Sequence, residues 1–177
     1  INNISSNGTI ILNRDDKYFN YLKKKANNKS LKIVSFGMSK NSDVCPISIK
    51  TNKNYKYLIV RVKKQILNIE FKDLNIYNIL SSLALLNELG LDLNKVTKSF
   101  KNFEPSQGRG KVHNILRYKK KFKLIDESYN ANPISVKNAI KMFNSIKKQN
   151  FKKYLLVGDM LELGNKSEVL HKDLSKV

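Results

Sequence analysis

Polar side chains gather in three short segments, each of which directly follows a predicted buried strand. The segments are NRDD at 13–16, DESYNANP at 126–133 and GDMLELG at 158–164. In open α/β sheets, ligands bind in the crevice outside the carboxyl ends of the strands. The order of elements therefore places these three segments where a ligand site forms.

Segment 126–133 has the groups that can hold a nucleotide. The carboxylates of Asp126 and Glu127 can accept hydrogen bonds from both ribose hydroxyls, and the ring of Tyr129 can stack on a base. Asn130 and Asn132 add two side-chain amides. The same residue types also build a turn before a capped helix, in which Asn and Ser side chains only satisfy backbone groups. The residues alone leave both interpretations open.

Two further segments place charged groups beside glycines. In GRG at 108–110, Arg109 can clamp a phosphate through two hydrogen bonds, because glycines let the backbone approach a ligand closely. The alternative is an ordinary hinge with a solvated arginine. In segment 158–164, Asp159 and Glu162 can bind a cation or an amine, and the alternative is a loop with solvated acids.

Several classes of site are excluded by composition. The single cysteine, Cys45, excludes intramolecular disulfides and zinc sites built on paired cysteines. His113 and His171 lack the spacing of metal ligands, so we predict no metal site here. The phosphate-loop pattern GxxxxGK[ST] is absent. No apolar run reaches the roughly 18 residues of a membrane span, and no signal peptide is visible. A cytoplasmic location without membrane insertion is therefore expected.

The chain carries a formal net charge of +20, which is typical of a protein that binds polyanions. An alternative cause is an A/T-rich genome, whose codons favour Lys, Asn and Ile. The chain has 30 lysines and 23 asparagines but only 4 arginines. Nucleic-acid binders rely on arginine to recognise bases and phosphates. We favour the genome explanation and expect no nucleic-acid partner, with a basic nucleic-acid-binding protein as the alternative function.

The first part of the chain is predicted to be an α/β domain with an antiparallel extension. Asp15 and Asp16 are expected in the first turn of the first helix, where they complement its dipole. The expected elements are a strand at 8–13, a helix at 15–26, a strand at 31–36, a strand at 44–50, a hairpin over 55–71, and helices at 75–89 and 92–102.

The second part of the chain begins near EPSQGRGK at 104–111, whose proline and two glycines indicate a domain boundary. A strand at 122–126, a helix at 134–149 capped by Asn132, and a strand at 154–158 form a second expected βαβ unit. A final helix follows the GDMLELG loop.

Together these segments resemble a known family. The runs LIDESYNANPISVKNAI (124–140) and LLVGDMLELGNKSEVLH (155–171) closely resemble the Mur ligase family. The resemblance covers essentially the whole chain, and SYNANP and GDMLELG are specific to one member. Weaker motifs occur in the same order: GTIILNRDD at 8–16, SFG at 35–37, LNIYN at 74–78 and GRG at 108–110.

The resemblance implies a cytoplasmic, monomeric enzyme of peptidoglycan synthesis, and so of cell-wall biogenesis, cell shape and cell division. Such an enzyme uses ATP and Mg²⁺ to phosphorylate the terminal carboxylate of a UDP-N-acetylmuramoyl-tripeptide. The amine of D-Ala-D-Ala then attacks the acyl phosphate. Residues 1–107 would be the C-terminal part of the central ATP-binding domain, and 108–177 the start of a Rossmann-like C-terminal domain.

The resemblance also implies roles for individual residues. Asn75 matches the asparagine that contacts the adenine region. Arg109 matches the arginine that reaches the ATP phosphates, and Glu127 stands where many relatives carry aspartate near the ribose. The remaining positions are placed by their loops alone: Tyr129, Asn130 and Asn132 in the nucleotide-facing loop, and Asp159 and Glu162 in the substrate vicinity.

Some family features are missing from these residues. Lys72 and Leu74 stand where the family usually has a glycine and a histidine before Asn75. The phosphate loop, the magnesium-binding residues and the carbamylated lysine are expected upstream of Ile1. The chain opens with Ile1 and closes inside a predicted helix, so we expect a fragment. Without the phosphate loop it should be inactive alone, and the uncovered edge and apolar face of the central sheet should make it poorly soluble. An inactive ligase remnant is a further alternative.

Overall fold

The computed structural model describes residues 1–52, 55–72, 74–146 and 152–177. The chain divides into two compact units, Ile1–Phe103 and Glu104–Val177. The division falls beside the proline- and glycine-rich segment in which the sequence predicts a boundary. The domain limit expected after Gln107 lies within the second unit, and as a limit between family domains it stays a prediction.

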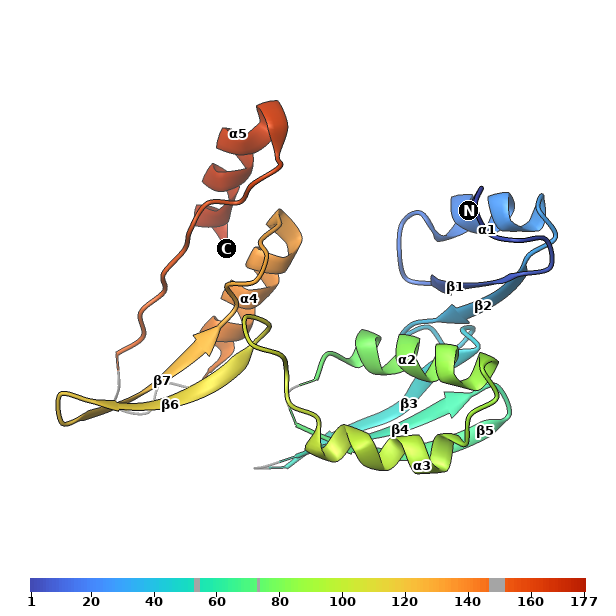
Figure 1. Ribbon diagram of the computed structural model, residues 1–177, viewed down its shortest axis with the longest axis horizontal. Coiled ribbons are helices and arrows are strands. Elements are labelled where there is room, and N and C mark those ends of the chain that lie inside the picture. Colours follow the sequence, from blue (N-terminus) through green and yellow to red (C-terminus); the bar gives the residue numbers. More distant parts are fainter. Residues whose placement is uncertain (53–54, 73, 147–151) are drawn as a thin grey trace. The chain divides into compact units, whose positions relative to one another are not determined.

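The first unit is built on one mixed five-stranded sheet with the order β1-β2-β3-β4-β5. β1 and β2 are parallel, with Thr9 opposite Lys32, and β2 continues parallel to β3 through Phe36 and Val44. β3, β4 and β5 are antiparallel neighbours. The predicted βαβ unit and hairpin extension are confirmed. The elements are β1 (Thr9–Asn13), α1 (Phe19–Asn27), β2 (Lys32–Phe36), β3 (Val44–Thr51), β4 (Lys56–Val62), β5 (Gln65–Phe71), α2 (Ile76–Glu88), α3 (Leu93–Thr97) and a 3-10 turn, η1 (Lys98–Asn102) (Figure 1).

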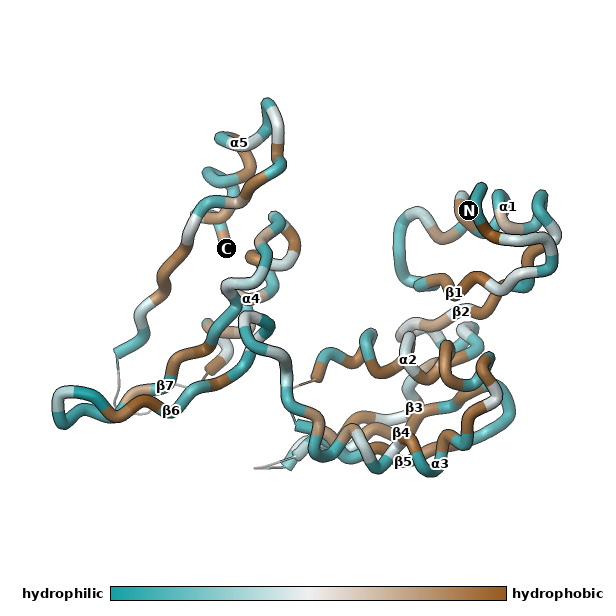
Figure 2. Tube along the Cα trace, viewed as in Figure 1, coloured by the Kyte–Doolittle hydropathy of each residue, from teal (hydrophilic) through white to brown (hydrophobic). Residues whose placement is uncertain are grey.

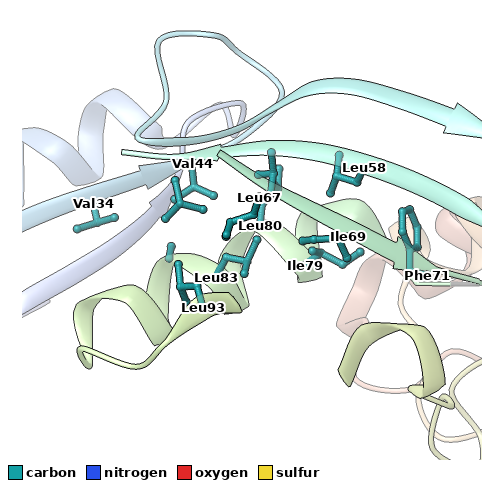
Figure 3. Packing of buried hydrophobic residues seen from close by; sticks show 13 residues of the cluster. Val34, Val44, Leu58, Leu67, Ile69, Phe71, Ile79, Leu80, Leu83 and Leu93 are labelled. Atoms are coloured by element: carbon teal, nitrogen blue, oxygen red, sulfur yellow. The ribbon is translucent and has the colours of Figure 1, made fainter. Parts of the chain in front are cut away.

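The main core of this unit lies between the sheet and the helix α2. Ile79, Leu80 and Leu83 of α2 are buried and are directed against strand residues such as Leu67 and Ile69 (Figure 3). The helical spacing of the α2 residues places them on one face, as the sequence predicts. Leu93 of α3 joins the same cluster, and Phe100 packs against it.

The first helix begins later than predicted, at Phe19 rather than Asp15. Asp16 Oδ1 accepts a hydrogen bond from Tyr18 N at 2.7 Å, and Asn13 Oδ1 accepts one from Asp15 N at 3.0 Å. These side-chain bonds build turns that compete with the helix. Asp15 and Asp16 therefore lie in the loop after β1, and the expectation that they start the helix was wrong.

The second unit has a two-stranded antiparallel sheet formed by β6 and β7, with Lys111 opposite Asp126. Helix α4 begins at Pro133 behind the cap Asn132, as predicted. It ends at Ser145, where Ile146 turns extended, and so earlier than the predicted end at 149. The elements are β6 (Lys111–Arg117), β7 (Lys120–Asp126), α4 (Pro133–Ser145), η2 (Gly164–Lys166), α5 (Ser167–Lys172) and η3 (Asp173–Lys176).

The predicted strand at 154–158 does not form. The segment is extended and hydrophobic (Figure 2), yet Leu156 is 93% exposed. The described part of the second unit has only β6 and β7 as strands, and β7 pairs with β6 alone. A strand needs a hydrogen-bonded neighbour, so the expected second βαβ unit with its parallel sheet is absent from these residues.

Candidate functional site

The start of β6 and the end of β7 bring the GRG segment against DESY. Gly110 N donates to Asp126 O at 2.8 Å, and Tyr129 N donates to Gly108 O at 3.1 Å. The Asp126 carboxylate also accepts from Gly108 N at 3.1 Å and from Ser128 N at 3.1 Å. The antiparallel register of the hairpin therefore joins two segments that the sequence singles out separately.

Both glycines have a left-handed backbone, and Gly108 also lies in close contact with the backbone of Tyr129. Gly108 has a φ of +75°, and a Cβ there would lie 2.8 Å from Tyr129 Cβ and 2.9 Å from Tyr129 N. Gly110 has a φ of +88°, and a Cβ there would lie 3.1 Å from Glu127 Oε1. A side chain at either position would meet the left-handed backbone strain and crowd the neighbouring loop.

Arg109 stacks on Tyr129 between these glycines. The guanidinium carbon lies 4.3 Å from the centroid of the Tyr129 ring, and Tyr129 is 68% exposed. Such a cation–π contact fixes the direction of an otherwise flexible side chain. The pair presents a cation for phosphate and an aromatic ring side by side to solvent.

The pKa values of the adjacent carboxyl groups of Asp126 and Glu127 are shifted in opposite directions. Hydrogen bonds from Ser128 and Gly108 hold the pKa of Asp126 below its usual range. Burial, together with the nearby charge of Asp126, raises the pKa of Glu127. The Asp126 carboxylate thus accepts the hydrogen bonds that shape the turn. The Glu127 carboxyl group is the one that can accept a hydrogen bond from a ligand.

The two asparagines of this loop act on the backbone. Asn132 Oδ1 accepts from Ile134 N at 3.0 Å and Ser135 N at 2.9 Å, and Asn132 N donates to Ser135 Oγ at 3.1 Å. This is a capping box for α4. Asn130 Oδ1 accepts from Ala131 N at 2.8 Å. The capped-turn interpretation therefore describes both asparagines, and their nucleotide-binding role stays a prediction.

Asn75 belongs to the first unit and caps α2. Its Oδ1 accepts from Tyr77 N at 2.8 Å, and the residue is exposed. With its oxygen bound to the helix, the side-chain amide nitrogen is the donor that Asn75 can direct to a ligand. Its contact with adenine stays a prediction.

The GDMLELG loop is anchored by a histidine that the sequence patterns do not single out. Met160 is 2% exposed, and its N–H donates to His171 Nε2 at 2.9 Å. His171 Nδ1 lies 2.8 Å from Ser167 O, so the ring carries its proton on Nδ1 and accepts at Nε2. The signal that points to it is the four-residue spacing from Ser167 within the final helix.

The two acidic residues of this loop reach solvent. The Asp159 side chain is 91% exposed, with Oδ1 3.9 Å from His171 Nε2. Glu162 is exposed and has a left-handed φ of +61°. Non-glycine residues adopt this conformation rarely, and they are enriched in functional loops. A role of Asp159 and Glu162 near a substrate stays a prediction.

Metal-binding clusters and membrane spans are both missing from the described residues. Within 1–52, 55–72, 74–146 and 152–177, no group of three His, Cys, Asp or Glu side chains is placed to hold a metal ion. In the same residues, no helix is both long and apolar enough to cross a membrane.

Residues 1–86 match the family model of the Mur ligase middle domain. This part of the chain is similar to the Mur ligase family. The match covers the five-stranded sheet, α1 and most of α2, and it includes Asn75. It confirms the resemblance seen in the motifs of residues 8–78.

Individual Mur ligases extend the similarity through the second unit. The UDP-N-acetylmuramoyl-tripeptide–D-alanyl-D-alanine ligase of Rickettsia prowazekii is 28% identical over 97% of this chain and 38% of its own length. MurF from Acinetobacter baumannii is 25% identical with a TM-score of 0.77 over 98% of this chain and 36% of its own. MurF from Thermotoga maritima in complex with ADP is 21% identical with a TM-score of 0.72, over 97% and 38%. The chain therefore spans less than two-fifths of the length of these relatives.

Proposed function

We propose that this chain is part of an ATP-dependent ligase that adds D-Ala-D-Ala to a UDP-N-acetylmuramoyl-tripeptide. The observation that carries the proposal is the Arg109–Tyr129 stack beside Glu127, in a chain similar to such ligases over nearly its whole length. In this assignment Arg109 contacts the phosphates of ATP, Glu127 the ribose, and Tyr129 lies along the nucleotide. Use of ATP is supported by the ADP complex of the Thermotoga maritima relative.

The reaction has two steps. A carboxylate oxygen of the tripeptide attacks the γ-phosphorus of ATP, and the bond to the β-phosphate oxygen breaks to release ADP. The dipeptide amine then attacks the acyl carbon, loses a proton and displaces phosphate. Charge builds on the transferring phosphoryl group, and a fixed guanidinium such as that of Arg109 stabilises it.

A divalent cation belongs to this proposal, but the described residues do not fit one. Within those residues, no three acidic, histidine or cysteine side chains converge on one point. We therefore keep the expectation that the Mg²⁺ ligands precede Ile1, and we derive no step through the metal. The full ligase is proposed to act in the cytoplasm as a monomer, in cell-wall biogenesis, without a nucleic-acid partner.

The test is a ligation assay on the full-length protein that contains this chain. With UDP-N-acetylmuramoyl-tripeptide, D-Ala-D-Ala, ATP and Mg²⁺, we expect a UDP-pentapeptide and one ADP per peptide bond. Omission of the UDP-tripeptide should stop ADP release, and omission of D-Ala-D-Ala should limit it to about one ADP per enzyme molecule, because the acyl phosphate then has no acceptor. A full-length, folded protein that forms no pentapeptide would contradict the proposal, and salt-sensitive binding to nucleic acid would favour the alternative.

A further inference from the structure

The side chain of Asp15 connects three elements of the first unit. Its carboxylate Oδ2 accepts from Met38 N, in the loop after β2, and from the hydroxyl of Tyr77 at 3.0 Å. Asp15 itself follows β1, and Tyr77 stands in the first turn of α2. The carboxyl ends of two parallel strands and the start of a helix therefore meet at one exposed carboxylate.

The space for this carboxylate is provided by Gly37. A Cβ at position 37 would lie 2.7 Å from Asp15 Oδ2 and 2.9 Å from its Cγ. The turn that holds Asp15 is fixed from the other side as well, because Arg14 N donates to Phe36 O at 2.7 Å. The position of Asp15 is therefore fixed by hydrogen bonds between the segments that follow β1 and β2, independently of its contact with the helix.

The contact with Tyr77 leads directly to Asn75. Tyr77 donates its hydroxyl hydrogen to Asp15 and its backbone N–H to Asn75 Oδ1, the latter at 2.8 Å. The same residue thus fixes both the first turn of α2 and the oxygen of the capping amide. With that oxygen bound, the direction of the Asn75 amide nitrogen depends on where Tyr77 stands.

We propose that Asp15 and Tyr77 are positioning residues for nucleotide binding, which orient the amide of Asn75 toward the adenine. The inference rests on the proposed function. Neither residue touches the reacting atoms in this assignment, so their loss weakens ATP binding while the chemistry of the bound complex is preserved. A contact that only stabilised the fold would lower the melting temperature without this selectivity.

The experiment measures KM and kcat in the full-length ligase for Tyr77→Phe, Asp15→Ala and Asp15→Asn. Loss of one hydrogen bond should raise KM for ATP about three- to tenfold in Tyr77→Phe and Asp15→Ala. The values of kcat and of KM for the UDP-tripeptide should stay within about twofold of the wild type, because neither the chemical step nor tripeptide binding is altered. Asp15→Asn should restore part of the loss, since its amide oxygen can still accept both hydrogen bonds.

Tyr21→Phe is the matched control, because Tyr21 is an exposed tyrosine of α1 in the same unit. This substitution should leave kcat and the KM values for ATP and the UDP-tripeptide unchanged. The inference is overturned if Tyr77→Phe and Asp15→Ala lower only the melting temperature, or if they change every constant alike.

A wild-type protein that forms no pentapeptide would contradict the proposed function separately. The inference is then tested on the Asn75 side-chain amide resonances of the full-length protein. These resonances should shift in Tyr77→Phe and Asp15→Ala but not in Tyr21→Phe, and unchanged resonances in all three would overturn the coupling.

Discussion

The two units of the chain differ in what they do with their apolar side chains. The first unit buries a continuous cluster between a five-stranded sheet and its helices. In the described part of the second unit, Ile140 and Met160 are the buried apolar residues. Many others are exposed there: Val112, Leu116, Tyr118, Phe122, Leu124, Tyr129, Ile134, Met142, Ile146, Tyr154, Leu155, Leu156, Val157, Leu161 and Val169.

The unit with the larger hydrophobic core is therefore not the unit that holds most of the candidate ligand-binding residues. A two-stranded sheet is marginal alone, whereas a larger sheet packed against helices can hold itself together. The stacked Arg109–Tyr129 pair and both acidic loops nevertheless belong to the thinly packed second unit. The candidate ligand groups there are held by local devices, such as close glycine contacts, a capping box and the His171 anchor, rather than by a deep core.

The largest effect should come from removing matched leucines in the two units. Leu80→Ala empties a fully buried site of α2 and should lower the free energy of unfolding by about 2–5 kcal/mol. Leu156→Ala removes a side chain that is 93% exposed and should change it by less than about 0.5 kcal/mol. Urea unfolding of each variant, followed by circular dichroism, gives both values. Similar losses would abolish the contrast between the units.

The effect of the close contact between Gly108 and Tyr129 can be measured by comparing two glycines with nearly equal φ angles. Gly90 has a φ of +73°, and a Cβ added there would have no heavy atom of the described residues within 4 Å, whereas Gly108 has +75° and would meet Tyr129. Alanine at either position should cost about 1–2 kcal/mol for the left-handed backbone. Gly108→Ala should in addition weaken ATP binding by the full-length protein. Titration calorimetry with both variants measures this, and equal ATP affinities would show that the Tyr129 contact is irrelevant.

The anchor of the GDMLELG loop can be tested by two substitutions of His171. Gln can retain an acceptor near Nε2 for Met160 N, whereas Asn retains only a group near Nδ1. We expect His171→Asn to destabilise the loop by about 1 kcal/mol and His171→Gln to cost less. Faster hydrogen exchange of the Met160 amide in the Asn variant is the readout. An unchanged exchange rate of the Met160 amide in His171→Asn would show that His171 does not anchor the loop.

The smallest expected effect is a loss of acid stability in the first unit. Glu88 forms ion pairs with Lys32 and Lys63, which lower its pKa from the reference value of 4.5. Its contribution is present above pH 4.5 and is lost as the pH falls through the lower folded-state pKa. Glu88→Gln should therefore reduce stability by about 1 kcal/mol or less near neutral pH. Below the folded-state pKa, urea unfolding should give the same stability for Glu88→Gln and the wild type, and a difference that persists there would contradict the assignment.

Much of the first unit could be predicted, because its signals are local. The alternation of residues 56–71 and the apolar spacing of α2 each point to one structure. Pro46 illustrates what local patterns omit. It lies near the start of β3 and inside the sheet, where a register shift between Pro46 and Ser48 accommodates it. The start of α1 was missed because side-chain bonds of Asn13 and Asp16 override helix propensity.

The second unit was predicted less well, since a strand is defined by its partner. The apolar run at 154–158 has strand composition, but no neighbouring strand pairs with it in the described residues. The sequence did indicate Arg109, Glu127 and Tyr129 as candidates, and the hairpin brings these three together. It placed Asp15 and Tyr77 in singled-out segments without indicating their mutual contact, which joins residues 62 positions apart, and it did not indicate the His171 anchor.

We propose above that the Arg109–Tyr129 stack binds the nucleotide of a peptide ligase. Its most direct test compares Arg109→Ala with Arg117→Ala, because Arg117 also lies over a tyrosine ring, at 5.0 Å from Tyr118. In the full-length ligase, Arg109→Ala should lower kcat/KM for ATP about 100-fold or more. Arg117→Ala should stay within about twofold of the wild type, as a surface substitution does. Equal kcat/KM values for the two variants would contradict the account.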